Sequence, residues 1–101
     1  MSKLIFSNKA INDLSSIWEY TAENWSQQQA DKYYDSLIYS CNKILQLPDI
    51  GRNYDIAMKG LKGYQSGKHI IFYFHKENSI IEITRILHER MDLKKRLTDK
   101  I

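Results

Sequence analysis

Apolar residues recur along this chain with two different spacings, which predict helices in the first half and strands in the second. Between Ala10 and Trp25 the apolar positions fall at three- and four-residue steps with acidic residues between them. That spacing is typical of an amphipathic helix, here ending near Asn24, whose solvent face would carry Asp13 and Glu19. A second stripe of the same kind, from Ala30 to Leu45, predicts another helix.

The residues that flank these stripes indicate where the helices begin and end. Ser7 or Asn8 can cap the first helix, because a short side-chain oxygen accepts a hydrogen bond from a free amide at a helix start. Ser26 with Gln29 has the form of a capping box, which predicts the start of the second helix. Pro48 ends that helix. The connection between the helices is so short that they must form an antiparallel hairpin.

Short segments rich in β-branched residues predict the strands. They are residues 3–6, 61–65, 68–76 and 80–87. Two- and three-residue turns separate the last three segments, so these strands pair in antiparallel fashion. Asp92 is expected to cap a short basic helix from Leu93 to about Lys100. The fold class is therefore α+β in a single domain, residues 1–101: an N-terminal strand, an antiparallel helical hairpin packed on an antiparallel β-sheet, and a short C-terminal helix.

The last predicted strand carries an arginine among apolar residues. Alternation along a strand places Ile81, Ile83, Arg85 and Leu87 on one face and Ile80, Glu82, Thr84, Ile86 and His88 on the other. The first of these faces should pack on the rest of the protein, so Arg85 would be half-buried and would need an anionic partner. That partner is either Asp or Glu within the chain, such as Asp92 or a helix carboxylate, or something that the protein binds.

Composition limits the cellular location and the type of partner expected for the protein. No apolar run approaches the roughly 20 residues that span a bilayer, and the short apolar start is not a signal peptide. The single cysteine, Cys41, fits the reducing cytoplasm. Residues 1–50 hold four Lys or Arg against six Asp or Glu, whereas residues 51–101 hold eleven against six. The basic second half favours an acidic partner, either nucleic acid or an acidic protein segment, unless it is simply a solvated surface.

The chain lacks the common motifs of cofactor and metal sites. It has no glycine-rich phosphate loop, no Cys-x-x-Cys and no His-Glu-x-x-His. His69 and His75 share a strand face but lie about 20 Å apart, so they cannot bind one metal ion. We therefore expect no metal and no cofactor.

Two groups of residues could nevertheless carry function. The first is a set of cations with two phenols and an imidazole: Arg52, Lys59, Lys62, Lys68, Arg85, Tyr64, Tyr73 and His88. A metal-free ribonuclease could use such a set, although the lysines could equally be solvated and Tyr73 a core residue. The second is an aromatic surplus, Trp18, Tyr20, Trp25, Tyr33, Tyr34, Tyr39 and Tyr54, which would suit a permanent protein partner.

Several segments in this order and spacing resemble the ParE toxins of the RelE/ParE superfamily, the toxins of type II toxin–antitoxin modules. The segments are Ser7–Leu14, Ile17–Tyr20, Ala30–Tyr33, Pro48–Arg52, Gly60–Lys62, Gly67–Tyr73 and Arg85–Asp92. The last two are the most specific. Lys62 and Lys68 stand where arginine is more usual in the family, and lysine cannot form a bidentate fork.

The resemblance implies a non-catalytic cytoplasmic toxin that inhibits DNA gyrase by binding. It also implies neutralisation by a ParD-like antitoxin, a ribbon-helix-helix protein with an acidic tail. The toxin would reach operator DNA only indirectly, through this antitoxin. Residues expected to bind the target or the antitoxin are Arg52, Lys62, Tyr64, Arg85, His88, Arg90, Asp92 and Trp18. The alternatives are a RelE-like ribosome-dependent mRNA endoribonuclease and an inactive module that titrates an antitoxin.

Overall fold

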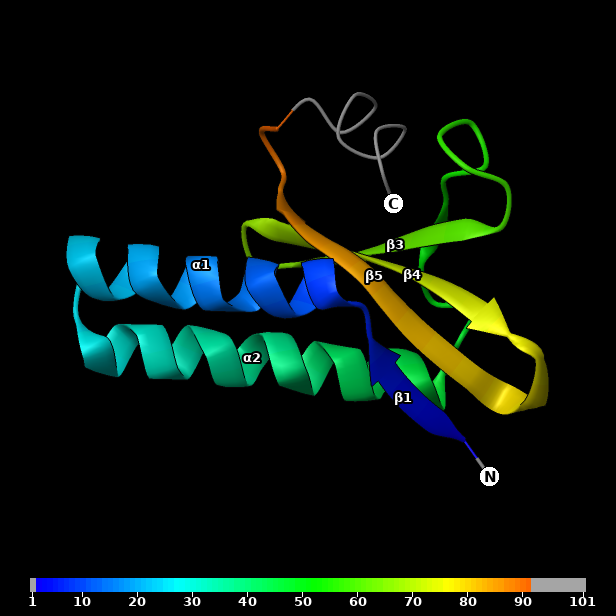
Figure 1. The fold of residues 1–101 in the computed structure, drawn as a ribbon, viewed down its shortest axis with the longest axis horizontal. Helices are drawn as coiled ribbons and strands as arrows, with labels where there is room; N and C mark the ends of the chain where they lie inside the picture. Colours follow the sequence, from blue (N-terminus) through cyan, green and yellow to red (C-terminus); the bar gives the residue numbers. More distant parts are fainter. Residues whose placement is uncertain (1, 92–101) are drawn as a thin grey trace.

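The computed structural model of the chain describes residues 2–91, which form two helices laid against one face of a twisted sheet (Figure 1). Helix α1 spans Asn8–Asn24 and helix α2 spans Gln27–Gln46. Ser7 caps α1 and Ser26 caps α2, as predicted, because their hydroxyl oxygens accept hydrogen bonds from Ala10 N and Gln29 N at 3.0 Å. Helix α2 ends immediately before Leu47 and Pro48.

The sheet has five strands in the order β1-β5-β4-β3-β2. The strands are β1 (Lys3–Phe6), β2 (Arg52–Asn53), β3 (Leu61–Ser66), β4 (His69–Lys76) and β5 (Ile80–His88). Strands β3, β4 and β5 form the predicted antiparallel meander, with ends within one residue of the prediction. The short strand β2 was not predicted, because two residues are too few to show the alternation that predicts a strand.

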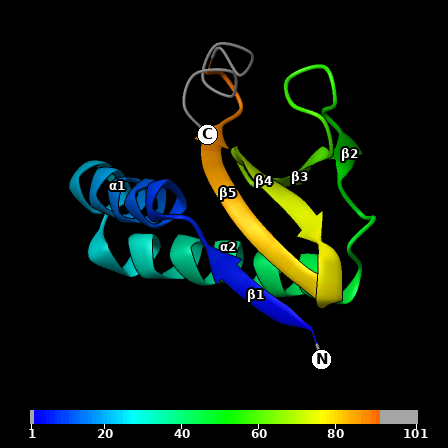
Figure 2. The same ribbon diagram turned by 45° about the vertical axis from the view of Figure 1, so that its right-hand side comes forward.

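Strand β1 pairs with β5 in parallel, from Lys3 opposite Ile80 to Phe6 opposite Ile83, so the sheet is mixed rather than purely antiparallel. The helical hairpin between β1 and the meander provides the long connection that a parallel pair requires. As a result the last described strand lies between the first strand and β4 (Figure 2). The α+β fold class is confirmed.

The main hydrophobic core lies between the helices and the sheet. Its buried members come from α1, α2, β4 and β5: Ala10, Leu14, Leu37, Cys41, Ile44, Ile71, Tyr73, Ile81, Ile83 and Ile86. Burial raises the pKa of the Cys41 thiol to about 12, so this cysteine is a packing residue rather than a nucleophile. Burying these side chains is the main source of stability for the arrangement.

A smaller core lies on the opposite face of the sheet. It consists of Leu61, Ile70, Phe72 and Leu87. Tyr54, Ala57, Met58 and Phe74 pack against it, so the segment between β2 and β3 covers this face. Residues alternate between the two cores along β4, as the pleat of a strand requires.

The predicted faces of β5 are wrong beyond Ile83. A bulge shifts the pairing register, so that Tyr73 lies opposite Ile83 and Phe72 lies opposite Arg85. The extra residue, Thr84, changes the phase of the alternation. Ile86 therefore joins Ile81 and Ile83 in the helix-side core, whereas Leu87 joins the smaller core and Arg85 lies opposite its member Phe72.

Neither helix of residues 2–91 combines the length and the apolar character that crossing a lipid bilayer would require. The predicted basic helix after Asp92 lies outside the described residues.

Candidate functional site

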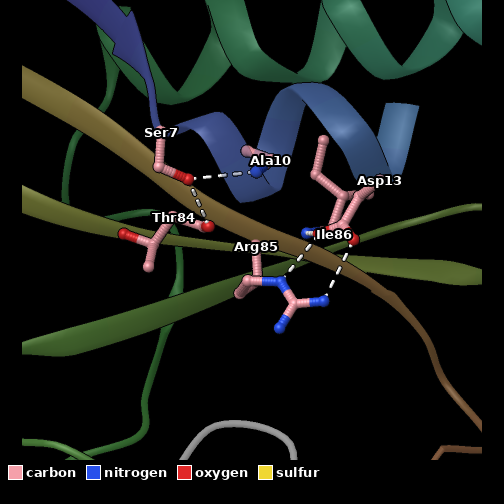
Figure 3. A network of polar contacts seen from close by, with 6 residues as sticks. All are labelled: Ser7, Ala10, Asp13, Thr84, Arg85 and Ile86. Carbon is pink, nitrogen blue, oxygen red and sulfur yellow. Dashed lines mark hydrogen bonds and ion pairs between the residues drawn. The ribbon is translucent and has the colours of Figure 1, made fainter. Parts of the chain in front are cut away.

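The Arg85 guanidinium pairs with the carboxylate of Asp13 on α1 (Figure 3). Arg85 Nε lies 2.9 Å from Asp13 Oδ2, and Arg85 Nη2 lies 3.0 Å from Asp13 Oδ1. Both side chains are mostly buried, with exposed fractions of 14% and 15%. The hydrogen bonds to Asp13 raise the pKa of Arg85, so the guanidinium stays charged. Of the two partners considered from the sequence, the helix carboxylate is the one present.

The same carboxylate also completes the hydrogen bonding of a strand edge. Strand β1 ends at Phe6, and beyond it the β5 edge faces α1. Ser7 N donates to Ile83 O at 2.9 Å, and Ser7 Oγ donates to Thr84 O at 2.7 Å. Ile86 N then donates to Asp13 Oδ2 at 2.9 Å. The start of α1 thus replaces the missing strand residue by residue, which satisfies backbone groups that would otherwise be costly to bury.

This geometry corrects two predictions. Asp13 was expected on the solvent face of α1, yet it is the partner of Arg85 and of the β5 edge. The signal available in the sequence was its position next to Leu14 and three residues after Ala10, at the border of the apolar stripe. Arg85 is held within the fold rather than presented to a partner.

His88 and Arg90 lie at the far end of β5, where His88 pairs across the sheet with His69. The two imidazole centroids are 5.2 Å apart. His88 Nδ1 accepts a hydrogen bond from Arg90 N at 3.0 Å. Arg90 has an exposed side chain, whereas His88 is half-buried. Arg90 is therefore available for a partner, but His88 organises the end of its own strand. Asp92 lies outside the described residues.

Tyr33 and His69 form a contact that sequence reasoning missed. Tyr33 Oη lies 2.6 Å from His69 Nδ1 and accepts a bond from Lys68 N at 3.0 Å. The tight turn at Gly67 permits this approach, because a Cβ there would lie 2.8 Å from the Tyr33 ring. Burial, with a contribution from His88, lowers the pKa of His69 to about 4. The ring is therefore neutral at pH 7, and Tyr33 Oη also donates a hydrogen bond to Ser66 O at 3.3 Å.

Arg52 and Lys62 lie on paired strands at the β2–β3 corner of the sheet, but the register places their side chains on opposite faces. Arg52 pairs with Gly63, and Asn53 pairs with Lys62, so the two cations are on adjacent, directly bonded strands. Arg52 is exposed and Lys62 is half-buried. Tyr64, two residues after Lys62, packs against the helix-side core. The strand pairing therefore does not bring these two cations into one cluster, and Tyr64 lies at the margin of the helix-side core.

Trp18 lines a groove between α1 and α2, with a cavity volume of about 570 Å³. The other lining residues are Leu14, Ser15, Glu19, Asp31, Tyr34 and Asp35. Trp18 Nε1 donates to Asp31 Oδ1 at 2.9 Å, which fixes the orientation of the indole. Three carboxylates around two aromatic rings make an environment for a cationic side chain, through ion pairing and cation–π contact. Trp18 thus lies at an acidic site, although the chain as a whole is basic.

Two members of the set proposed for a ribonuclease, Tyr73 and Arg85, are held inside the fold. Tyr73 is fully buried, and its hydroxyl donates to Pro48 O at 2.7 Å and accepts from Gly51 N at 3.0 Å. Arg85 is paired with Asp13. Tyr73 and Arg85 are therefore structural, so neither is free to act on a phosphate.

No group of three or more His, Cys, Asp or Glu side chains suited to a metal ion occurs within residues 2–91. The chemistry that the described surface supports is recognition: cations at the β2–β3 corner and an acidic aromatic groove on the helices.

Comparisons with known proteins agree with this class of small recognition domain. A chain in the structure titled "Chromosomal ParDE TA system from P. aeruginosa" superposes with a TM-score of 0.75 at 18% identity. The match covers 87% of this chain and 96% of that one, which shows a shared fold. The family model described as "ParE toxin of type II toxin-antitoxin system, parDE" matches residues 4–93. The chain belongs to the ParE toxin family, as its sequence motifs indicated.

Characterised relatives match along nearly their whole length. Toxin ParE1 of Mycobacterium tuberculosis is 31% identical over 96 residues, which cover 95% of this chain and 98% of the relative. Toxin ParE1 of Caulobacter vibrioides is 31% identical over 91 residues, or 90% and 93% of the two chains. Toxin ParE of Escherichia coli is 26% identical over 101 residues.

Removing the charge of Asp13 should destabilise the fold strongly. Asp13→Asn leaves Arg85 buried without its counter-ion, so we expect the free energy of unfolding to fall by about 2–4 kcal/mol. The matched control is Glu82→Gln, which breaks the more exposed Lys76–Glu82 pair and should cost less than about 1 kcal/mol. Urea unfolding of both variants measures the difference. Equal losses in the two variants would contradict the structural role of Asp13.

Acid should destabilise the protein partly through His69. The unfolded ring takes up a proton near pH 6.5, whereas the folded ring resists protonation down to about pH 4. The free energy of unfolding should therefore fall as pH is lowered between those values, with a slope from this group of at most about 1.4 kcal/mol per pH unit. In His69→Gln the decline over this window should be shallower, as urea unfolding at several pH values would reveal. An unchanged slope would exclude His69 as a source.

Proposed function

We propose that this ParE-family chain is a toxin that acts by binding DNA gyrase, without catalysing a reaction, and that a ParD-like antitoxin neutralises it. The observation that carries the proposal is family membership over residues 4–93, together with relatives named as ParE toxins. The described surface supports binding chemistry rather than turnover, because Arg85 and Tyr73 are engaged inside the fold. The toxin would act in the cytoplasm, where gyrase and DNA are found.

We propose that part of the antitoxin binds in the groove lined by Trp18. Its length along two antiparallel helices suits an amphipathic segment, and its three carboxylates favour an arginine or lysine on that segment. Trp18 would act as the central aromatic anchor, because its ring is already held by Asp31 and loses little entropy on binding.

The β2–β3 corner suits the acidic part of the same antitoxin. The exposed Arg52 and the half-buried Lys62 lie there on paired strands, and cations at a surface steer an acidic segment toward it. An antitoxin with one cationic anchor and an acidic tail would match both surfaces. Contact with operator DNA would come only through the DNA-binding domain of the antitoxin.

A RelE-like ribonuclease receives no support from the arrangement of side chains. Tyr73 and Arg85, the tyrosine and arginine considered for phosphate chemistry, are engaged inside the fold with Gly51 and Asp13. Stabilising a phosphorane needs donors that face the substrate.

The gyrase proposal predicts that the purified chain inhibits DNA supercoiling by gyrase and that prior addition of its antitoxin restores supercoiling. The physical reason is occupation of a gyrase surface, so inhibition should rise with toxin concentration and saturate. Supercoiling assays resolved on agarose gels measure the effect, and RNA incubated with translating ribosomes serves as the control. Cleavage of that RNA, with supercoiling unaffected, would reject the proposal in favour of a ribonuclease.

The antitoxin proposal predicts that Trp18→Ala weakens antitoxin binding by at least about tenfold, as expected for loss of a central aromatic anchor. Trp25→Ala is the matched control, because Trp25 is 76% exposed and does not line the groove. Titration calorimetry with the antitoxin encoded beside this gene compares the two variants. Equal affinities would place the antitoxin on another surface.

A further inference from the structure

The segment between β2 and β3 is a loop held in shape by its own hydrogen bonds. Asp55 Oδ1 accepts from Gly60 N at 2.8 Å, which closes the loop across its base. Asp55 N donates to Asn53 Oδ1 at 2.6 Å, and Asp55 Oδ2 accepts from Asn53 Nδ2 at 3.1 Å. Ala57 N and Met58 N both donate to Tyr54 O. A partner that binds this loop therefore pays little of the entropy of ordering it.

The loop turns most of its apolar side chains inward and one outward. Tyr54, Ala57 and Met58 pack on the smaller core, which attaches the loop to the sheet. Ile56 points the other way and is 87% exposed, more than any other large apolar side chain of residues 2–91. A single exposed apolar residue is ordinary on a flexible surface. On a loop that is both closed by hydrogen bonds and anchored in a core, it is a fixed apolar knob.

Cations lie in this loop and on the two strands that flank it. Arg52 and Lys62 lie on the paired strands at the base of the loop, and Lys59 lies within it. Asp55 is the single carboxylate between residues 52 and 62, and it is next to Ile56 in the chain. A duplex DNA partner is disfavoured, because it would bring phosphates against that carboxylate. An apolar pocket with acidic residues at some distance around it fits the charge pattern better.

The loop is also separate from the groove on the helices. In both ribbon views it projects near β2, away from α1 and α2 (Figures 1 and 2). Its inner side covers the sheet face opposite the helix-side core. Two different partners, or two parts of one complex, can therefore reach the groove and the loop from different directions.

We propose that the loop of residues 53–60 is the part of the toxin that enters its target, with Ile56 inserted into an apolar pocket rimmed by carboxylates on the target protein. The inference rests on the proposed function in that the chain must act by binding a protein. It does not require the target to be gyrase.

The test compares Ile56→Asp with Ile11→Asp, which places the same change at an isoleucine 50% exposed on α1. Each full-length variant is induced in cells without antitoxin, and growth is measured against the level of toxin. Purified variants are also titrated into the gyrase supercoiling assay. We expect Ile56→Asp to need at least about tenfold more toxin for the same growth arrest, whereas Ile11→Asp matches the original chain. Thermal unfolding and antitoxin binding should be unchanged in both variants.

Growth arrest by Ile56→Asp at the original toxin level would overturn the inference, and so would an equal loss in Ile11→Asp. A chain that never arrests growth would overturn it together with the proposed function. Loop-dependent arrest with supercoiling unaffected would instead keep the loop and reject gyrase as the target. A gel-shift assay with duplex DNA in the absence of other proteins tests a nucleic-acid partner. If the original chain binds this DNA and Ile56→Asp does not, the inference of a protein pocket is overturned.

Discussion

The contact between Asp13 and the free edge of β5 holds the two halves of this protein together. One carboxylate neutralises Arg85 and accepts the backbone hydrogen of Ile86. Without it β5 would have unpaired backbone groups where β1 stops, and the mostly buried Arg85 would lack a counter-ion. The position of α1, and with it one wall of the groove lined by Trp18, follows from this contact.

The same contact explains why an arginine in a β-strand is not a binding residue here. The sequence motif Arg85–Asp92 groups this arginine with Arg90, which suggests that the two residues share a functional role. The geometry separates them: Arg85 faces inward to Asp13, whereas Arg90 is exposed beyond the strand end. Residues that identify a family can thus do so because they are needed for its fold.

Helices, caps and the three-stranded meander could be predicted because each depends on local spacing and turn chemistry. Ser7, Ser26 and Pro48 are examples in which the relevant partner lies within a few residues. The bulge at Thr84 could not be predicted, because it arises from the pairing of β5 with β4, and it reverses the faces of every residue after it. The parallel partner of β1 and the contact of Tyr33 with His69 depend on segments far apart in sequence. The candidate site was predicted less well than the fold for this reason: Arg52 and Lys62 lie on paired strands but on opposite faces, and the acidic character of the Trp18 groove required α2 to be placed beside α1.

The parallel pairing of β1 with β5 has a consequence for the time at which this protein folds. Lys3 leaves the ribosome first, but its partner Ile80 is among the last of the described residues to be made. The sheet cannot close, and the helix-side core cannot be completed, until β5 has emerged from the ribosome. The domain therefore reaches its folded state only after β5 has been made.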